Sequence, residues 1–340
     1  MRKKALQILI SLLLLISVCC GETVTLIDFT GHQVELSAPV TKTVSLSAAA
    51  SEILWALDEG KSMVGRSTSS NFPPMIESLT VAGKHSNSPD LELIMELEPE
   101  LVIADTMLSE EDRKVLEEDG IAVVVERFID PNRTLLVIEN LGRALGKEER
   151  ASELAGQLKG YHDLIKERIS GTNSEERPTV FFEWLGKPYH SASNGTSYDN
   201  FIDFAGGVDI AANESVDYPD VSPEWVIEKD PDVILHILGS SKDYTEKELE
   251  QWRDEIISRP ELQNSRAVKE GRVYVLSGTV ATGIRSAIGE LYLAKWFYPE
   301  LFEDIDPEAE HEKLIDKFYG LDLEGAYAFP SSSFLEMEIE

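Results

Sequence analysis

The first part of the chain alternates short apolar strands with helical segments. Residues 24–47 switch regularly between apolar and polar positions, a period of two that predicts strands with one solvated face. Residues 101–104 and 122–125 are continuous apolar runs, as expected of strands buried on both faces. Helical spacing between these runs predicts an α/β lobe with a mostly parallel sheet over residues 22–145.

A long helical period separates this lobe from a second one. Residues 131–170 contain almost no turn signal except Gly146, and we expect an interlobe helix over 146–172. A polar loop follows, and a new apolar run at 179–182 opens a second α/β lobe over 177–300. Residues 301–340 are interpreted as an acidic C-terminal extension. The predicted fold is α/β, with two Rossmann-like lobes of mostly parallel sheets joined by a long interlobe helix.

An internal repeat links the two lobes. Residues 91–103 correspond to residues 223–235, with a short helix, an acid-Pro-acid turn and a buried strand in the same order. Glu92 and Glu224 occupy equivalent positions near the helix starts, where unpaired backbone N–H groups favour a carboxylate. One interpretation is helix-start chemistry alone. The other, which is compatible with it, is a symmetric docking surface for a partner with two basic sockets.

The N-terminus has the layout of an export signal. Basic residues at positions 2–4 precede an apolar run at 5–18, which is too short for a membrane-spanning helix. We therefore predict a signal peptide over residues 1–20 with a lipobox-like end, and lipidation of Cys19 or Cys20. An ordinary cleaved signal with two incidental thiols is the alternative. Either interpretation places the mature protein outside the cytoplasm, at the outer face of the cytoplasmic membrane or in the periplasm.

Charge and motif content narrow the function. The chain has 31 basic and 62 acidic side chains, a net charge of −31, which disfavours nucleic acid or anionic lipid as a partner. It has no nucleophile elbow, phosphate loop or metal-binding histidine pair, so no catalytic residue and no cofactor are predicted. We expect a monomeric binding protein rather than an enzyme.

Several segments, in order, resemble a known family. Residues 43–54, 72–74, 83–86 and 90–92 in the first half, and 182–184, 204–207, 221–224 and 271–275 in the second, are similar to the substrate-binding proteins of ABC importers for iron chelates, haem and cobalamin. The resemblance implies two lobes joined by a rigid helix. It also implies that Glu92 and Glu224 form salt bridges with arginines of the permease dimer, which works with ATPase subunits.

The resemblance also bears on the ligand. Cobalamin binders of this family cradle the macrocycle with tryptophan or tyrosine from both lobes, whereas the corresponding positions here are Ser69, His85, Asp105 and the region of Thr279. Residues 293–302 are more like members that transport iron complexes. We therefore expect an iron(III) complex as the ligand. Cobalamin and haem are the alternatives, and molybdate or tungstate is less favoured than either. A surface receptor without transport, or a metal-transferring enzyme, stays open as a different class.

Candidate ligand contacts follow from the fold, because open α/β sheets bind ligands beyond the carboxyl ends of their strands. Arg285 could clamp an anionic group, His85 could bind a metal or hydrogen-bond a chelator, and Trp184 could stack on a planar ligand or belong to the core. His190 and His236 are further candidates. The predicted ligand-binding residues are Ser47, Arg66, Ser69, His85, Asp105, Trp184, Tyr189, Tyr218, Thr279 and Arg285.

Overall fold

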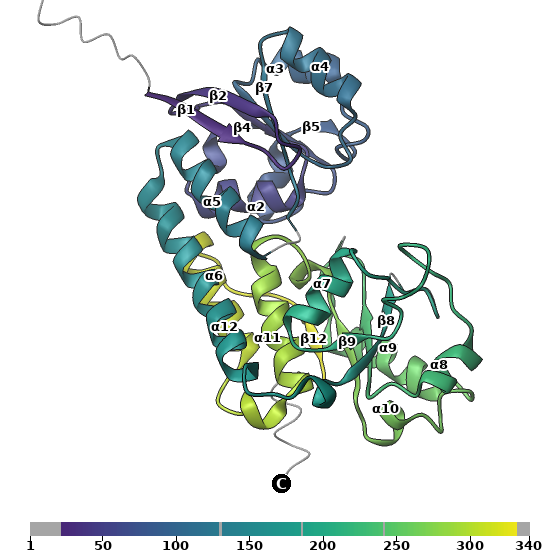
Figure 1. Ribbon diagram of the computed structural model, residues 1–340. Helices are drawn as coiled ribbons and strands as arrows, with labels where there is room; N and C mark the ends of the chain where they lie inside the picture. Colours follow the sequence, from purple (N-terminus) through teal and green to yellow (C-terminus); the bar gives the residue numbers. More distant parts are fainter. Residues whose placement is uncertain (1–21, 129–130, 185, 241, 332–340) are drawn as a thin grey trace, which may run out of the picture.

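The computed structural model describes residues 22–128, 131–184, 186–240 and 242–331. The predicted signal peptide, with Cys19 and Cys20, and the end of the predicted C-terminal extension lie outside these residues. Two α/β lobes lie one above the other in Figure 1, and helices run along one side of both. The fold class predicted from the sequence is confirmed.

The first lobe contains a five-stranded, all-parallel sheet in the order β5-β4-β3-β6-β7. A separate antiparallel hairpin, β1 (Glu22–Ile27) and β2 (Gln33–Ala38), precedes it. Helices α2 and α5 (Pro131–Leu145) pack on one face of the sheet, and α3 and α4 pack on the other. The strands are β3 (Thr43–Ser45), β4 (Met63–Ser67), β5 (Thr80–Gly83), β6 (Leu101–Asp105) and β7 (Ala122–Glu126), and the helices are α2 (Ala48–Ala56), α3 (Leu91–Leu97) and α4 (Glu110–Glu118).

The second lobe contains a five-stranded sheet in the order β12-β11-β10-β8-β9, parallel except for β12. Its strands are β8 (Thr179–Trp184), β9 (Val208–Asp209), β10 (Val233–Ile237), β11 (Val273–Leu276) and β12 (Ala328–Phe329). Its helices are α7 (Ser197–Phe204), α8 (Pro223–Lys229), α9 (Glu246–Ser258), α10 (Arg266–Lys269) and α11 (Ser286–Phe297). Side chains of α7 and α11 cover one face, and side chains of α8, α9 and α10 cover the other.

Two consecutive helices connect the lobes. Helix α5 (Pro131–Leu145) ends at Gly146, whose φ of 65° suits a residue without a Cβ, and α6 (Glu148–Ile169) then runs along both lobes (Figure 1). Leu154 and Leu158 of α6 are buried in one apolar core that continues from the first lobe into the second. Because this core is continuous, α6 is packed along its length rather than exposed as a linker.

The chain beyond residue 300 is integrated into the fold. Strand β12 is the antiparallel edge of the second sheet, and α12 (Pro307–Tyr319) packs against α11 and against α2 of the first lobe. Leu314 and Phe318 of α12 are buried in the shared core. The described part of the predicted acidic extension therefore contributes a helix and an edge strand to the fold.

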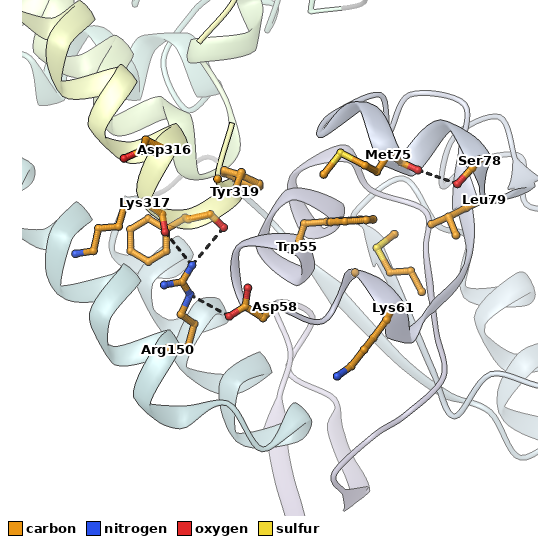
Figure 2. Close-up of a pocket in the computed structure, with 14 residues that line it drawn as sticks. Trp55, Asp58, Lys61, Met75, Ser78, Leu79, Arg150, Asp316, Lys317 and Tyr319 are labelled. Carbon is orange, nitrogen blue, oxygen red and sulfur yellow. Dashed lines mark hydrogen bonds and ion pairs between the residues drawn. The ribbon is translucent and has the colours of Figure 1, made fainter. Parts of the chain in front are cut away.

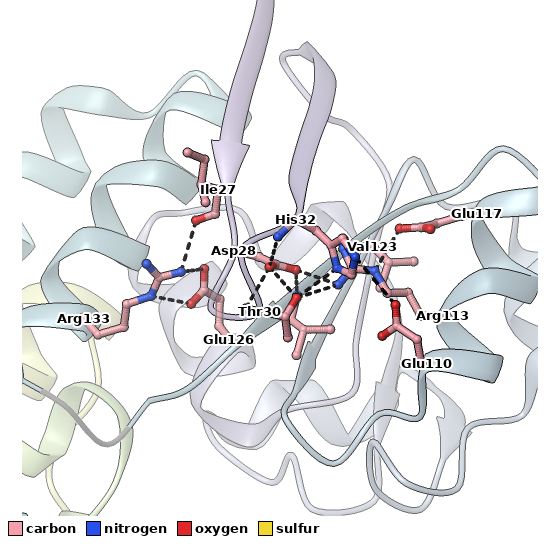
Figure 3. Close-up of polar contacts among 11 residues, drawn as sticks. Ile27, Asp28, Thr30, His32, Glu110, Arg113, Glu117, Val123, Glu126 and Arg133 are labelled. Atoms are coloured by element: carbon pink, nitrogen blue, oxygen red, sulfur yellow. Dashed lines mark hydrogen bonds and ion pairs between the residues drawn. The ribbon is translucent and has the colours of Figure 1, made fainter.

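A buried polar network fixes the hairpin to the first lobe (Figure 3). Asp28 accepts hydrogen bonds from the amides of Thr30, at 2.9 Å, and His32, at 3.0 Å. Its other oxygen accepts from Arg113 Nη1 of α4 at 2.9 Å and from the amide of Val125 at 3.2 Å. Burial opposes ionisation of this carboxyl, but the donors outweigh it and lower the pKa of Asp28. A charged Asp28 therefore joins the turn after β1 to β7 and α4.

Candidate functional site on the interlobe surface

The carboxyl ends of the two sheets face each other. Arg127, which follows β7, donates from Nη2 to the carbonyl of Gly195, which lies between β8 and α7, at 3.2 Å. Glu52 of α2 pairs with Arg285 of the short helix η5 (Gly283–Arg285), which follows β11. We define the interlobe surface as the residues that follow the strand ends in both sheets. The fold rule for open α/β sheets places a ligand there.

A chain of serine hydroxyls connects Ser69 to the interior of the first lobe. Ser51 Oγ lies 2.9 Å from Ser45 Oγ and 2.8 Å from Ser70 Oγ. Ser67 Oγ lies 3.1 Å from Ser70 Oγ and 2.7 Å from the half-buried Ser69 Oγ. These contacts hold the loop after β4 in place and orient its hydroxyls. Sequence analysis named Ser69 but not Ser51 or Ser70, although Ser51 lies in a segment that carries the family resemblance.

Ser47 and Arg66 have clear roles within the first lobe. Ser47 is the N-cap of α2, and its buried side chain accepts from the amide of Ala50 at 3.5 Å. Arg66 donates from Nη1 to the carbonyls of Ser67 and Ser70, at 3.1 and 3.0 Å, and from Nη2 to that of Glu77 at 3.3 Å. The guanidinium thereby ties together the loop that contains Ser69.

His85 follows β5, Asp105 ends β6, and the two side chains lie near each other. The amide of Asp105 donates to Ser86 Oγ at 3.0 Å, and its carboxylate accepts from the amide of Met107 at 2.9 Å. Burial raises the pKa of Asp105, and the Met107 amide, Ser86 and the nearby His85 oppose that shift. Met107 is 51% exposed beside them. This part of the surface offers an imidazole from the loop after β5 and a carboxyl from the end of β6.

Aromatic rings form the corresponding part of the second lobe. The Trp184 ring, at the end of β8, lies 4.9 Å from the Tyr218 ring and 6.0 Å from the nearly parallel His190 ring. Tyr198 of α7 supports Trp184 at 5.4 Å, and Tyr218 is 38% exposed. His190 Nδ1 lies 2.7 Å from Asp220 Oδ1, which orients the imidazole. The structure brings Trp184, Tyr218 and His190 into one tier, suited to stacking on a flat ligand.

The other second-lobe candidates have partners within the protein. Tyr189 donates its phenol hydrogen to Glu261 at 2.8 Å and stacks on Phe181, on the sheet face covered by α8, α9 and α10. His236 is fully buried, with Nδ1 3.1 Å from Glu183. Thr279 is also buried, and its hydroxyl lies 2.8 Å from Ser277 Oγ. Of these three, none joins the aromatic tier.

Arg285 forms an ion pair between lobes. Its Nε lies 3.0 Å from Glu52 Oε2, and its Nη2 lies 2.6 Å from Glu52 Oε1. The Phe72 ring lies 4.4 Å from the guanidinium carbon. Its side chain therefore has a carboxylate and a ring as partners already. Sequence analysis quoted Glu52 and Phe72 only as parts of motifs.

The two repeated helices are matched in detail. Helix α3 starts after the N-cap Asp90, and α8 starts after the N-cap Ser222, so Glu92 and Glu224 are each the second helical residue. Both helices end in a left-handed residue, Glu98 in one and Asp230 in the other. Glu92 and Glu224 are both exposed. Each lobe therefore presents one carboxylate from an equivalent position.

Two large cavities lie near the amino ends of the strands of the first sheet. One, of about 700 Å³, lies between the end of α2 and α12 and is lined by Trp55, Met75 and Tyr319 (Figure 2). The other, of about 710 Å³, includes Val40 and Ser62, which precede β3 and β4. Both lie near the amino ends of the strands, and none of the ten predicted ligand residues lines either one. The fold rule therefore favours the interlobe surface over these cavities.

Neither a metal cluster nor a membrane-spanning helix is present among the described residues. In that part of the chain, no three histidine, cysteine, aspartate or glutamate side chains are grouped so that they could hold a metal ion. No helix there has the length and apolar character needed to cross a membrane.

Comparison with known proteins gives a consistent result. The family described as periplasmic binding protein matches residues 43–279. An uncharacterised ABC transporter substrate-binding lipoprotein of Bacillus subtilis, YvrC, is 25% identical over 83% of this chain and 87% of its own length. A cobalamin-binding protein of Halobacterium salinarum is 28% identical, and the match spans 64% of this chain and 59% of that relative.

A solved structure shows the same fold. The TroA-like periplasmic binding protein FepB of Veillonella parvula superposes with a TM-score of 0.78 at 24% identity, and the match covers 91% of this chain and all of that one. The family match and the two-lobed fold with its repeated helices agree. The chain therefore belongs to the periplasmic binding protein family, as an extracytoplasmic substrate-binding component of an ABC transporter.

Proposed function

We propose that the protein captures a metal complex on the interlobe surface and delivers it to the permease of an ABC importer, without catalysing a reaction. An iron(III) complex is the first candidate ligand. The aromatic tier of Trp184 and Tyr218 on one lobe would hold its flat part. On the other lobe, Ser69, His85 and Asp105 would bind its polar groups.

The observation that carries the transport role is the symmetry of Glu92 and Glu224. Carboxylates at matched positions on two lobes suit a permease built as a dimer, because each half of such a dimer could offer the same basic socket. Helix-start electrostatics favours a carboxylate at each of these positions and is compatible with docking, but it does not require the same position on both lobes. A monomer tethered through lipidated Cys19 or Cys20 would keep this surface near the membrane.

Cobalamin is the second candidate ligand. The tier of Trp184, Tyr218 and His190 could cover a corrin ring from one side, and several relatives are named as cobalamin- or vitamin B12-binding proteins. Against it, the first lobe presents Ser69, His85 and Asp105 in place of a second aromatic wall. Haem would use the same tier, and molybdate would rely on the hydroxyls alone.

The docking role can be tested with matched double variants. Glu92→Ala with Glu224→Ala should weaken binding to the permease–ATPase complex by at least about tenfold, because each lobe loses a charge contact. Ligand affinity should stay unchanged, because neither side chain is among the predicted ligand-binding residues. Glu96→Ala with Glu228→Ala is the control, since these exposed glutamates are also related by the repeat, one turn further along each helix.

The two outcomes separate transport from its alternatives. Loss of permease binding in the first variant but not in the control supports delivery to a transporter. Equal binding by both variants would contradict the docking role and favour a surface receptor that does not engage a permease.

A further inference from the structure

The arginines next to the interlobe surface are already committed to partners within the protein. Arg285 donates to both oxygens of Glu52, and the two side chains are only 4% and 9% exposed. Arg66 uses both terminal nitrogens on backbone carbonyls of its own lobe. Arg127 donates to the carbonyl of Gly195 and lies 5.7 Å from the centre of the Phe29 ring. None of these guanidiniums is poised to receive an anionic ligand without breaking protein contacts.

The basic groups of the second lobe are also neutralised. Lys187 Nζ lies 2.7 and 2.9 Å from the two oxygens of Asp220, and His190 shares the same carboxylate. Among the described residues of the interlobe surface, Lys84 is the one ammonium without a carboxylate partner. It lies next to His85 in the loop after β5, and the carboxyl of Asp105 lies beside that imidazole. This part of the surface thus holds one ammonium and one carboxyl, which leaves no excess of fixed positive charge.

Apart from Lys84 and Asp105, the groups named on this surface are hydrogen-bonding or aromatic. The hydroxyl of Ser69 and the rings of Trp184 and Tyr218 can bind groups that carry no charge. An anion held between the lobes would lose part of its hydration, and the attraction of Lys84 would be opposed by the carboxyl of Asp105 on the same surface, which is unfavourable. The net charge of −31 would also repel it during approach.

We infer that the ligand is a metal complex without net negative charge, an inference that rests on the proposed capture of a metal complex. For iron, this distinguishes two chemical classes with the same metal and six oxygen donors. Fe³⁺ bound by three singly charged hydroxamates is neutral at the metal centre, whereas Fe³⁺ bound by three doubly charged catecholates carries a charge of 3−. Neutral cyanocobalamin falls within the inferred class, and the oxyanion molybdate falls outside it.

The test is isothermal titration of the full-length protein with a ferric trihydroxamate, a ferric tricatecholate, cyanocobalamin and molybdate. A neutral complex should bind at least about 100-fold more tightly than the tricatecholate or molybdate. Its affinity should change less than about twofold between roughly 0.05 and 0.5 M NaCl, because no net charge on the ligand is screened. In Asp105→Asn, the ratio of neutral to anionic affinities should fall, because a negative charge is removed from the surface.

Each other outcome has a distinct meaning. Equal or tighter binding of the tricatecholate or molybdate would overturn the charge inference while leaving the binding function intact. Failure of every complex to bind would contradict the proposed capture of a metal complex itself. If the ratio of neutral to anionic affinities were unchanged in Asp105→Asn, the carboxyl of Asp105 would not contribute to the rejection of anionic ligands.

Discussion

Glu52 and Arg285 form a two-pronged ion pair that joins the lobes. Glu52 belongs to α2 of the first lobe, Arg285 belongs to η5 of the second, and both side chains are almost completely buried. Burial raises the pKa of Glu52, and the adjacent guanidinium opposes that shift. Because the fork of an arginine matches a carboxylate in direction as well as charge, the pair fixes how the lobes approach each other.

Aromatic side chains surround this pair. The Phe72 ring covers the guanidinium and meets the edge of the Tyr319 ring at 4.9 Å. Tyr319, at the end of α12, donates its phenol hydrogen to the backbone carbonyl of Glu52 at 3.1 Å. Phe72 lies in the chain that leads away from Ser69 and Ser70. The Glu52–Arg285 pair, the end of α12 and the chain that follows the Ser69 loop therefore meet in one cluster of side chains. We expect the angle between the lobes to change little on ligand binding.

Glu52→Gln should lower the free energy of unfolding by about 3–5 kcal/mol, because it leaves the guanidinium of Arg285 buried without a charged partner. Urea unfolding monitored by circular dichroism measures the change. Glu153→Gln, which removes exposed pairs with Arg150 and Lys317, is the control and should cost much less. A loss below about 1 kcal/mol in Glu52→Gln would show that the pair does not hold the lobes together.

Glu126 gives a prediction about pH. Burial raises its pKa to about 7, although Arg133 binds both carboxylate oxygens, at 2.8 and 2.7 Å (Figure 3). The folded state therefore keeps a proton that the unfolded chain, with an ordinary value of 4.5, has released. Stability from this group is present below about pH 4.5 and falls as the pH rises towards 7.

Glu126→Gln should remove this component of the pH dependence. The measurement is the slope of unfolding free energy against pH in that window, in wild type and variant. Some slope should remain, because burial also raises the pKa of Asp209 to about 7. Identical slopes in the two proteins would mean that Glu126 is ionised throughout the window.

Tyr218→Ala should weaken ligand binding by about tenfold, because the tier beside Trp184 loses one of its rings. Val208→Ala is the control. Val208 is an apolar residue whose exposure, 39%, is similar to that of Tyr218, and it lies at the amino end of β9, away from the carboxyl ends of the strands. Titration with the same ligand compares the two variants. Similar affinities for both would place the ligand away from the aromatic tier.

Local patterns were enough to predict much of the fold. The N-caps Asp90 and Ser222, the prolines before two strands and Gly146 are all signals within a few residues of the elements that they delimit. The repeat then related the two lobes, so that the equivalent positions of Glu92 and Glu224 followed without a structure.

The site depends on contacts that no local pattern contains. Glu52 and Arg285 are 233 positions apart, and nothing near either residue identifies the other as its partner. Tyr189 follows a strand end, as a ligand residue should. However, its backbone lies in a turn, with a φ of 60°, and its side chain packs on the sheet face covered by α8, α9 and α10. Strand β12 has only two residues and pairs at an edge, which is too short for a periodicity signal.

The central claim is that a metal complex binds between the lobes beside Trp184, and tryptophan fluorescence tests it most directly. Wild-type protein, Trp184→Phe and Trp252→Phe would be titrated in parallel with ferric chelates, haem, cobalamin and molybdate. Trp252 is the control, because its ring stacks on the buried His236. We predict saturable quenching by one metal complex in wild type and Trp252→Phe, and its loss in Trp184→Phe. Equal quenching in all three proteins, or no response to any complex, would contradict the account.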